Sequence, residues 1–232
     1  GIASRGLGDV YKRQESNIYK IRYDLIAEFL GTFVLVFIGC GSIILSEIME
    51  FNKIFIPISF GGSIACMVYI FGKYSGAHFN PGVTIGFLID KKIKLTDAFL
   101  YISIQLFGAL IASYIHLLMF GLNNSLGLTI KNTSDLNAYL LEIFFTFLLM
   151  TVIFLVTKKQ NFYDGIAIGG IVAISAFLIG DLTGGSLNPA RSLGPMIVKG
   201  NFLSLDLYIL GPIVGASLAS LIKKFIEQLI KN

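Results

Sequence analysis

Two short stretches of this chain place an Asn directly before a Pro, each between long apolar runs. The first, SGAHFNP, contains Asn80 and Pro81, and the second, GGSLNPAR, contains Asn188 and Pro189. Proline suits the first turn of a helix, where its missing N–H would have no partner anyway, and the preceding asparagine suits the capping position. Each motif therefore predicts a helix N-terminus, which offers unpaired N–H groups and roughly half a positive charge. Two such ends that met would repel a cation and donate hydrogen bonds to a neutral molecule.

The composition places these motifs in a membrane. Of the 232 residues, 55% are hydrophobic and only 14% are charged, and the mean hydropathy of +0.78 is far too apolar for an ordinary water-soluble domain. The net charge is +4, and the charged residues lie mostly between the apolar runs, which favours a lipid bilayer rather than nucleic acid as the partner. The two cysteines, Cys40 and Cys66, have no metal-ligand spacing, so we expect neither a metal nor a cofactor.

Six apolar runs are long enough to cross a bilayer as helices, which takes about 20 residues. They are Leu25–Ser46, Ile54–Gly72, Ala98–Gly121, Ala138–Thr157, Gly165–Leu182 and Leu205–Ile222. Two further apolar segments, Asn80–Asp90 and Asn188–Val198, begin at the Asn-Pro motifs and are only about half as long. Backbone that ends inside a membrane must be buried in protein or line a watery cavity. These two segments therefore predict re-entrant half-helices beside a pore or a binding site.

The chain divides into two matching halves, about 22–121 and 136–225, within one channel domain of about 22–225. Residues 1–21 read as a polar leader whose opening letters we regard as an assembly artefact, and 226–232 read as a tail. Three spans in each half place the halves in opposite orientations, as an inverted repeat. Most of the 18 Lys and Arg residues fall in the N-terminus, the loop after the second span, the 157–164 loop and the C-terminus. This distribution predicts that both termini are cytoplasmic.

Each half carries one acid well inside its first apolar run, Glu28 in AEFLGT and Glu142 in LEIFFT. An intramembrane carboxylate is costly and tends to face the protein interior. It could relay protons or ions, or it could accept hydrogen bonds from the nearby re-entrant loop and hold that loop in place. We favour the second interpretation, because the pair is symmetric and no series of intramembrane Lys or His accompanies it.

Arg191 lies three residues after Asn188 and keeps its charge at any ordinary pH. A lone Arg at membrane depth must find partners in hydrocarbon, so it is more often functional than structural. We expect its charge on the outer side of the motifs.

The doubled Asn-Pro motif, Arg191, the paired acids and the three-plus-three arrangement resemble the aquaporin family, also called the major intrinsic proteins. The resemblance covers about residues 22–225. It implies an all-α membrane protein with a bundle of six transmembrane helices and two re-entrant half-helices, a pore in each protomer, and a homotetramer. The pore motifs that it assigns are Asn80, Pro81 and Gly82, and Asn188, Pro189 and Ala190.

Spacing from the two asparagines carries the family's narrow selectivity filter onto Phe60, Ala176, Gly185 and Arg191. Water-selective members tend to have a His where this chain has Ala176. The methyl group of Ala176 and the bare Gly185 predict a filter that is wider and less polar on two walls, with Phe60 and Arg191 opposite. Selectivity in such pores depends on diameter and on the donors and acceptors of the lining.

Two positions depart from the family pattern. Glycerol-conducting members usually carry Asp directly after the filter Arg, whereas this chain has Ser192, as water channels do. Gly82 replaces Ala in the first motif, and the missing methyl group predicts a looser contact between the half-helices. A small-residue filter followed by Ser is similar to the nodulin-26-like and related microbial branch, whose members pass water together with glycerol, urea or metalloid acids.

These features predict a passive channel for water and small uncharged solutes that excludes ions and protons. The alternatives are a strict water channel, an ion- or proton-coupled transporter, which would need further intramembrane ionisable groups, and a scaffold with a closed pore. An enzyme is not expected, because the chain has no HExxH, no phosphate-binding Gly-rich loop and no nucleophile–His–acid set. His78, just before Asn80, leaves open a pH gate or a structural hydrogen bond.

Overall fold

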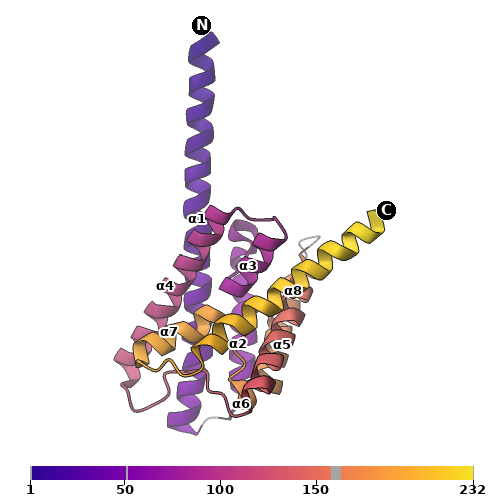
Figure 1. Ribbon diagram of the computed structural model, residues 1–232. Coiled ribbons are helices and arrows are strands. Elements are labelled where there is room, and N and C mark those ends of the chain that lie inside the picture. The colour runs from indigo at the N-terminus through magenta and orange to yellow at the C-terminus, as the bar shows by residue number, and fades with distance from the viewer. Residues whose placement is uncertain (1, 51, 158–162, 232) are drawn as a thin grey trace.

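The computed structural model describes residues 2–50, 52–157 and 163–231, with side chains from Tyr23 onward, and the elements of this part of the chain are all α-helices (Figure 1). They are α1 (Ile2–Met49), α2 (Phe55–Ser75), α3 (Pro81–Ile89), α4 (Leu95–Phe120), α5 (Asp135–Val156), α6 (Asp164–Thr183), α7 (Pro189–Lys199) and α8 (Leu205–Lys231). The side chains of the expected leader, 1–21, and the basic residues Lys158 and Lys159 lie outside what is described.

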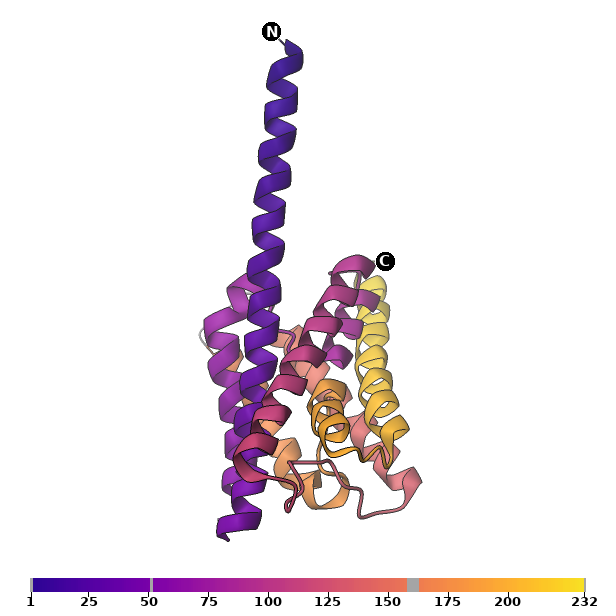
Figure 2. The same ribbon diagram turned by 90° about the vertical axis from the view of Figure 1, so that its left-hand side faces the viewer.

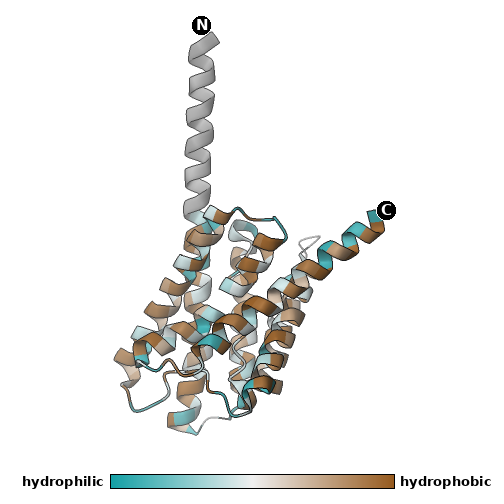
Figure 3. Cartoon of the chain, in the orientation of Figure 1, coloured by the Kyte–Doolittle hydropathy of each residue, from teal (hydrophilic) through white to brown (hydrophobic). Residues whose placement is uncertain are grey.

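Among the described residues, six helices are long and apolar enough to cross a membrane, and the two that are not are α3 and α7. In α1 the qualifying stretch is Tyr23–Met49. This confirms the all-α membrane fold and its six predicted spans. Hydrophobic residues, coloured brown, recur along these helices (Figure 3), and the side chains of Phe99 and Leu118 are 70% and 69% exposed. Lipid, rather than water, is the solvent that suits such surfaces.

The two halves of the chain pack in the same way. In the first half α1 lies against α2 and α4, and in the second half α5 lies against α6 and α8, while α2 and α6 join the halves. Each half-helix packs mainly on the last span of the other half, α3 on α8 and α7 on α4. In Figures 1 and 2, α3 and α7 lie toward opposite ends of the bundle. The arrangement therefore has the form of the predicted inverted repeat with two re-entrant segments.

Close contact between helices depends on small residues at equivalent places. A Cβ at Gly108 of α4 would lie 2.7 Å from the carbonyl oxygen of Phe29 in α1. A Cβ at Gly215 of α8 would lie 2.3 Å from the carbonyl oxygen of Ile143 in α5. Because neither backbone can move aside easily, glycine is required at both crossings.

The last span is longer than the sequence predicted. The apolar run ends at Ile222, but α8 continues to Lys231, so the segment expected as a tail is helical as far as that residue. Hydropathy marks where charges begin, at Lys223, whereas Lys, Glu, Gln and Leu are all good helix formers and carry the helix onward.

Candidate functional site

Each Asn-Pro motif caps a half-helix, as its sequence predicted. Oδ1 of Asn80 accepts a hydrogen bond from the N–H of Gly82 at 2.8 Å, and Pro81 occupies the first turn of α3. Oδ1 of Asn188 accepts one from the N–H of Ala190 at 3.0 Å, and Pro189 begins α7. Asn188 also accepts from the N–H of Arg191 at 3.4 Å, so the caps satisfy one backbone donor in α3 and two in α7 and fix the orientation of each amide.

The two motifs are also joined crosswise. Nδ2 of Asn80 donates to the carbonyl oxygen of Leu187, the residue before Asn188, at 2.8 Å. Nδ2 of Asn188 donates to the carbonyl oxygen of Phe79, the residue before Asn80, at 2.8 Å. An amide nitrogen has two N–H donors, so each asparagine keeps one donor for a molecule beside it.

The residues before the asparagines have unusual backbone conformations. Phe79 has φ of 50° and Leu187 has φ of 51°, a left-handed region that bulky residues rarely occupy. Gly76 and Gly184 begin the two loops with φ of 81° and 78°, where glycine suffers no strain. The two loops thus repeat one backbone path, and Phe79 and Leu187 must be held in it by other groups.

The two buried acids supply that restraint. Glu28 accepts hydrogen bonds, at 2.9 and 2.7 Å, from the backbone N–H groups of the two residues before Asn80. Glu142 does the same for the two residues before Asn188, at 2.9 Å in both cases. A hydroxyl group near the start of each loop donates a third bond to each carboxylate. Both acids therefore have their acceptors used by the loops, which supports the loop-holding interpretation over an ion relay.

Arg191 is 1% exposed and lies where α7 begins. Its Nη1 donates to the carbonyl oxygen of Gly127 at 2.8 Å, and its guanidinium carbon lies 5.0 Å from the centre of the Phe60 ring. Its Nε and Nη2 are buried and have no partner among the described residues. Buried donors without partners are costly. The side chain is therefore arranged to donate two hydrogen bonds to a water molecule or a solute.

Gly127 is a site residue that the sequence analysis missed. It has φ of +75°, and a Cβ there would lie 2.4 Å from Cβ of Cys40 in α1. Only glycine lets this loop pass against α1 and present its carbonyl to Arg191. A glycine in a loop between two spans belongs to no recognisable motif, so no signal beyond its residue type was available.

The wall that α6 contributes to the lumen near Arg191 carries only small side chains. Ala176 lines the opening with a methyl group. A Cβ at Gly185 would lie 3.4 Å from Cα of Ala176 and 3.6 Å from Cα of Gly180. A Cβ at position 185 would make only ordinary van der Waals contact with α6, so glycine is favoured here by its φ of 53°, which other residues rarely adopt. Both predicted residues belong to the wall, but only Ala176 contributes a side-chain position to it.

A narrow lumen of about 40 Å³ brings the predicted site residues together. Its lining includes both motif asparagines and all four predicted filter residues. A cavity of about 460 Å³ on the Arg191 side shares Phe60, Ala176 and Arg191 with the lumen, and a cavity of about 740 Å³ on the His78 side shares Ala77 and His78 with it. The lumen therefore lies between two wide vestibules, and its volume is enough for only a few water molecules.

The two departures from the family pattern fall outside the lumen lining. A Cβ at Gly82 would lie 3.2 Å from the carbonyl oxygen of Pro212 in α8 and 3.2 Å from Oδ1 of Asn80. The methyl group that this chain lacks would thus meet α8, not the other half-helix, which corrects the expected loosening. Oγ of Ser192 lies 3.1 Å from Oγ1 of Thr129 and 2.6 Å from Oγ of Ser186, so it joins two loops to α7.

His78 lies in the loop between α2 and α3, where the lumen meets the cavity of about 740 Å³. Its Nδ1 is 3.1 Å from Oγ1 of Thr84, and its ring stacks on Phe87 with centres 4.5 Å apart. Burial disfavours the charged imidazole and lowers the pKa of His78 to about 3. These contacts support the structural hydrogen bond over a gate that titrates near neutrality.

Comparison with known proteins agrees with this geometry. The sequence model of the major intrinsic protein family matches residues 15–223. The chain belongs to the major intrinsic protein family. This member is 38% identical over 199 residues to nodulin-26 of Glycine max, an alignment that covers 83% of this chain and 73% of that protein. It is 39% identical over 208 residues to the glycerol uptake facilitator protein-like 6 of Lactiplantibacillus plantarum, covering 84% and 94%.

The X-ray structure of the aquaglyceroporin from Plasmodium falciparum has the same fold as this major intrinsic protein, with a TM-score of 0.76 and 26% identity. The match covers 87% of this chain and 93% of that one. The predicted resemblance to the nodulin-26-like and related microbial branch is confirmed by these relatives.

Proposed function

We propose that this protein is a passive channel for water and small uncharged solutes such as glycerol. The observation that carries the proposal is the lumen, whose lining combines unused N–H donors with an apolar wall. Arg191, Asn80 and Asn188 provide the donors, and Ile64 and Val172 are among the apolar residues that line it. A polyol can place its hydroxyl groups along the donors and its carbon chain along the wall, as the names of the bacterial and Plasmodium relatives would lead one to expect.

Exclusion of cations has three sources in this arrangement. The N-termini of α3 and α7 meet at the asparagines and direct partial positive charge into the lumen. Arg191 adds a full charge at the outer end. A water molecule held by the spare N–H groups of both asparagines has its lone pairs occupied, so it cannot accept a proton from its neighbour. We assign the selectivity filter to four residues of the lumen lining: Phe60, Ala176, Gly185 and Arg191.

A strict water channel is the second candidate, because Phe60 and Arg191 stack closely and narrow the outer end of the lumen. Ser192, the residue that favoured a water channel in the sequence, does not itself line the lumen, because its hydroxyl group is bonded to Thr129 and Ser186. We therefore give more weight to the small Ala176 wall.

The assembly and orientation are part of the same proposal. We place both termini in the cytoplasm, because Lys91, Lys92 and Lys94 lie in the loop at the end of the bundle where α8 also ends (Figure 1). We propose a homotetramer on family resemblance. Chemical cross-linking in the membrane would show four bands if the tetramer forms and a monomer only if it does not.

A gradient experiment separates the channel from a coupled transporter. Proteoliposomes containing the protein would be loaded against radiolabelled glycerol with and without an inward pH or sodium gradient. A channel takes up glycerol at one rate under all conditions, until the concentrations are equal. Accumulation above the outside concentration, dependent on either gradient, would overturn the proposal.

A further inference from the structure

An exposed apolar stripe follows α8 along its whole length. Large apolar side chains that are 39–78% exposed recur every three or four positions: Leu210, Val214, Leu218, Leu221, Ile222, Phe225, Ile226, Leu229 and Ile230. The first of these lie in the membrane span, and the stripe continues past Lys223 without a break. The surface of α8 that faces lipid in the span is therefore continued by Phe225, Ile226, Leu229 and Ile230.

The other face of these last turns is polar. It carries Lys223, Lys224, Glu227, Gln228 and Lys231. At 100° per residue the apolar and polar side chains occupy separate halves of the helix surface, as in helices that lie in a membrane interface. Lysines beside an apolar face can extend toward lipid headgroups.

The position of this segment fits an interface. Both ribbon views show α8 ending at about the height of the loop between α3 and α4, and Figure 1 shows it leaning sideways from the bundle. A helix with the 27 residues of α8 is about 40 Å long, whereas the hydrocarbon core is about 30 Å thick. Its inclination keeps the last turns near the membrane surface rather than in the cytoplasm.

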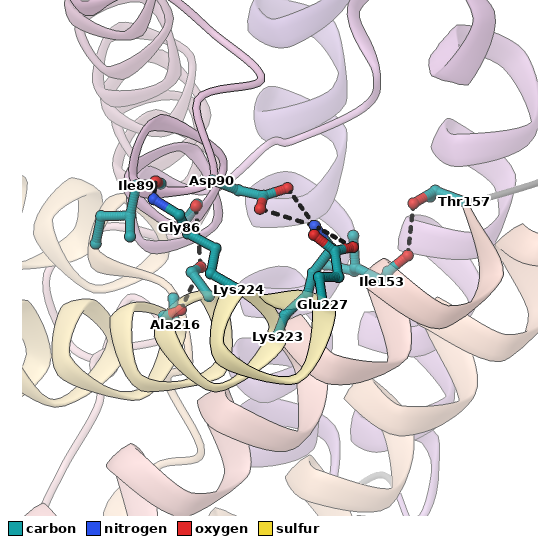
Figure 4. Close-up of polar contacts among 10 residues, drawn as sticks. Gly86, Ile89, Asp90, Ile153, Thr157, Ala216, Lys223, Lys224 and Glu227 are labelled. Atoms are coloured by element: carbon teal, nitrogen blue, oxygen red, sulfur yellow. Dashed lines mark hydrogen bonds and ion pairs between the residues drawn. The ribbon is translucent and has the colours of Figure 1, made fainter. Parts of the chain in front are cut away.

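The polar face of the same turns holds the C-terminal end of α3 (Figure 4). Nζ of Lys223 donates to both carboxylate oxygens of Asp90 at 2.7 Å and lies 3.2 Å from Oε1 of Glu227. The Asp90 side chain is only 4% exposed. Nζ of Lys224 donates to the carbonyl oxygen of Ile89 at 3.2 Å. Positive charge at a helix C-terminus is favourable, so these contacts fasten α3 to α8.

We propose that residues 223–231 of α8 form an amphipathic anchor on the inner surface of a bilayer that contains anionic phospholipid, and that this anchor steadies α3. Phe225, Ile226, Leu229 and Ile230 enter the acyl boundary, and Lys231 faces the headgroups. Lys91, Lys92 and Lys94, in the loop at the same height, add positive charge toward the same leaflet. The anchor is independent of which solute the lumen conducts.

Spin labels on neighbouring residues test the anchor directly. Gln228→Cys and Leu229→Cys would each be made in a Cys66→Ser background, because Cys66 is exposed whereas Cys40 is buried. The labelled proteins would be studied in vesicles of phosphatidylcholine and phosphatidylglycerol, by power saturation with oxygen and a water-soluble nickel chelate. We expect oxygen collisions to exceed nickel collisions at position 229 and the reverse at position 228. Nickel excess at both positions would overturn the anchor, as would dipolar broadening at 229 that disappears on dilution with unlabelled protein, since a second copy would then cover the face.

A matched pair of substitutions tests the connection to α3. Leu229→Asp and Gln228→Asp add the same charge to adjacent residues on the apolar and the polar face. We expect Leu229→Asp to lose water flux per channel and to shift the label at position 225, introduced as Phe225→Cys, toward nickel access, with Gln228→Asp unchanged in both. Equal flux in the two variants, whether reduced or not, would overturn the connection to α3.

Discussion

Replacing Arg191 with Val removes the only permanently charged side chain among the described residues that line the lumen. The guanidinium carbon lies 5.0 Å from the centre of the Phe60 ring. We take about the same distance between the Arg191 charge and a cation that passes beside it. Two unit charges about 5 Å apart repel by about 3 kcal/mol at an effective dielectric constant of about 20. Because each 1.36 kcal/mol changes a rate tenfold, Arg191→Val should raise cation flux roughly two-hundredfold. The helix N-termini remain, so exclusion should be weakened rather than abolished.

The assay is proton and sodium flux into proteoliposomes, normalised to water flux through the same preparation. Water flux that persists in Arg191→Val shows that the pore is folded. Arg191→Lys serves as the control, because it keeps the positive charge but removes the guanidinium group that donates to the carbonyl oxygen of Gly127. Cation flux in Arg191→Val equal to that of the parent, with water flux intact, would refute the role assigned to this charge.

Three further expectations concern the filter wall, a buried acid and pH. Ala176→His should reduce glycerol flux more than water flux in light-scattering measurements, because the imidazole narrows the wall that a methyl group now forms; equal losses would contradict this. Glu142→Gln should lower the thermal unfolding midpoint in detergent, since its amide N–H group would face a backbone N–H donor of the loop and leave it unsatisfied, at a cost of about 1–3 kcal/mol; an unchanged midpoint would count against loop holding. Water permeability should be flat from pH 5.5 to 8, because the lowered pKa of His78, about 3, keeps the imidazole neutral throughout; a step that His78→Ala removes would show a gate.

Hydropathy and two motifs were enough to predict the membrane fold. The expected half-helices, Asn80–Asp90 and Asn188–Val198, differ by a residue or so at each end from α3 and α7. Asn-Pro is a local signal, because the cap and the first-turn proline act within a few residues of each other. Because the second Asn-Pro motif repeats the first in the other half of the chain, the two half-helices were expected to meet at their N-termini.

Contacts between distant segments could not be predicted in the same way. The bond from Arg191 to Gly127 uses a backbone carbonyl, which every residue has, so no residue type points to it. The place of Gly82 against Pro212 depends on how α3 crosses α8, which spacing along the chain does not specify. The predicted span ended at Ile222, before the end of α8, because hydropathy identifies segments that are apolar on all sides. The last turns of α8 are apolar on one face only.

Stopped-flow light scattering on proteoliposomes would decide whether the lumen passes glycerol as well as water. It would compare shrinkage under an impermeant osmolyte with reswelling in glycerol and in urea, against vesicles without protein. We expect rapid shrinkage, and glycerol reswelling well above the lipid background, because the methyl group of Ala176 fills little of the lumen on that wall. Rapid water flux with glycerol reswelling at the lipid rate would contradict it and would identify the stacked Phe60 and Arg191 as a water-only constriction.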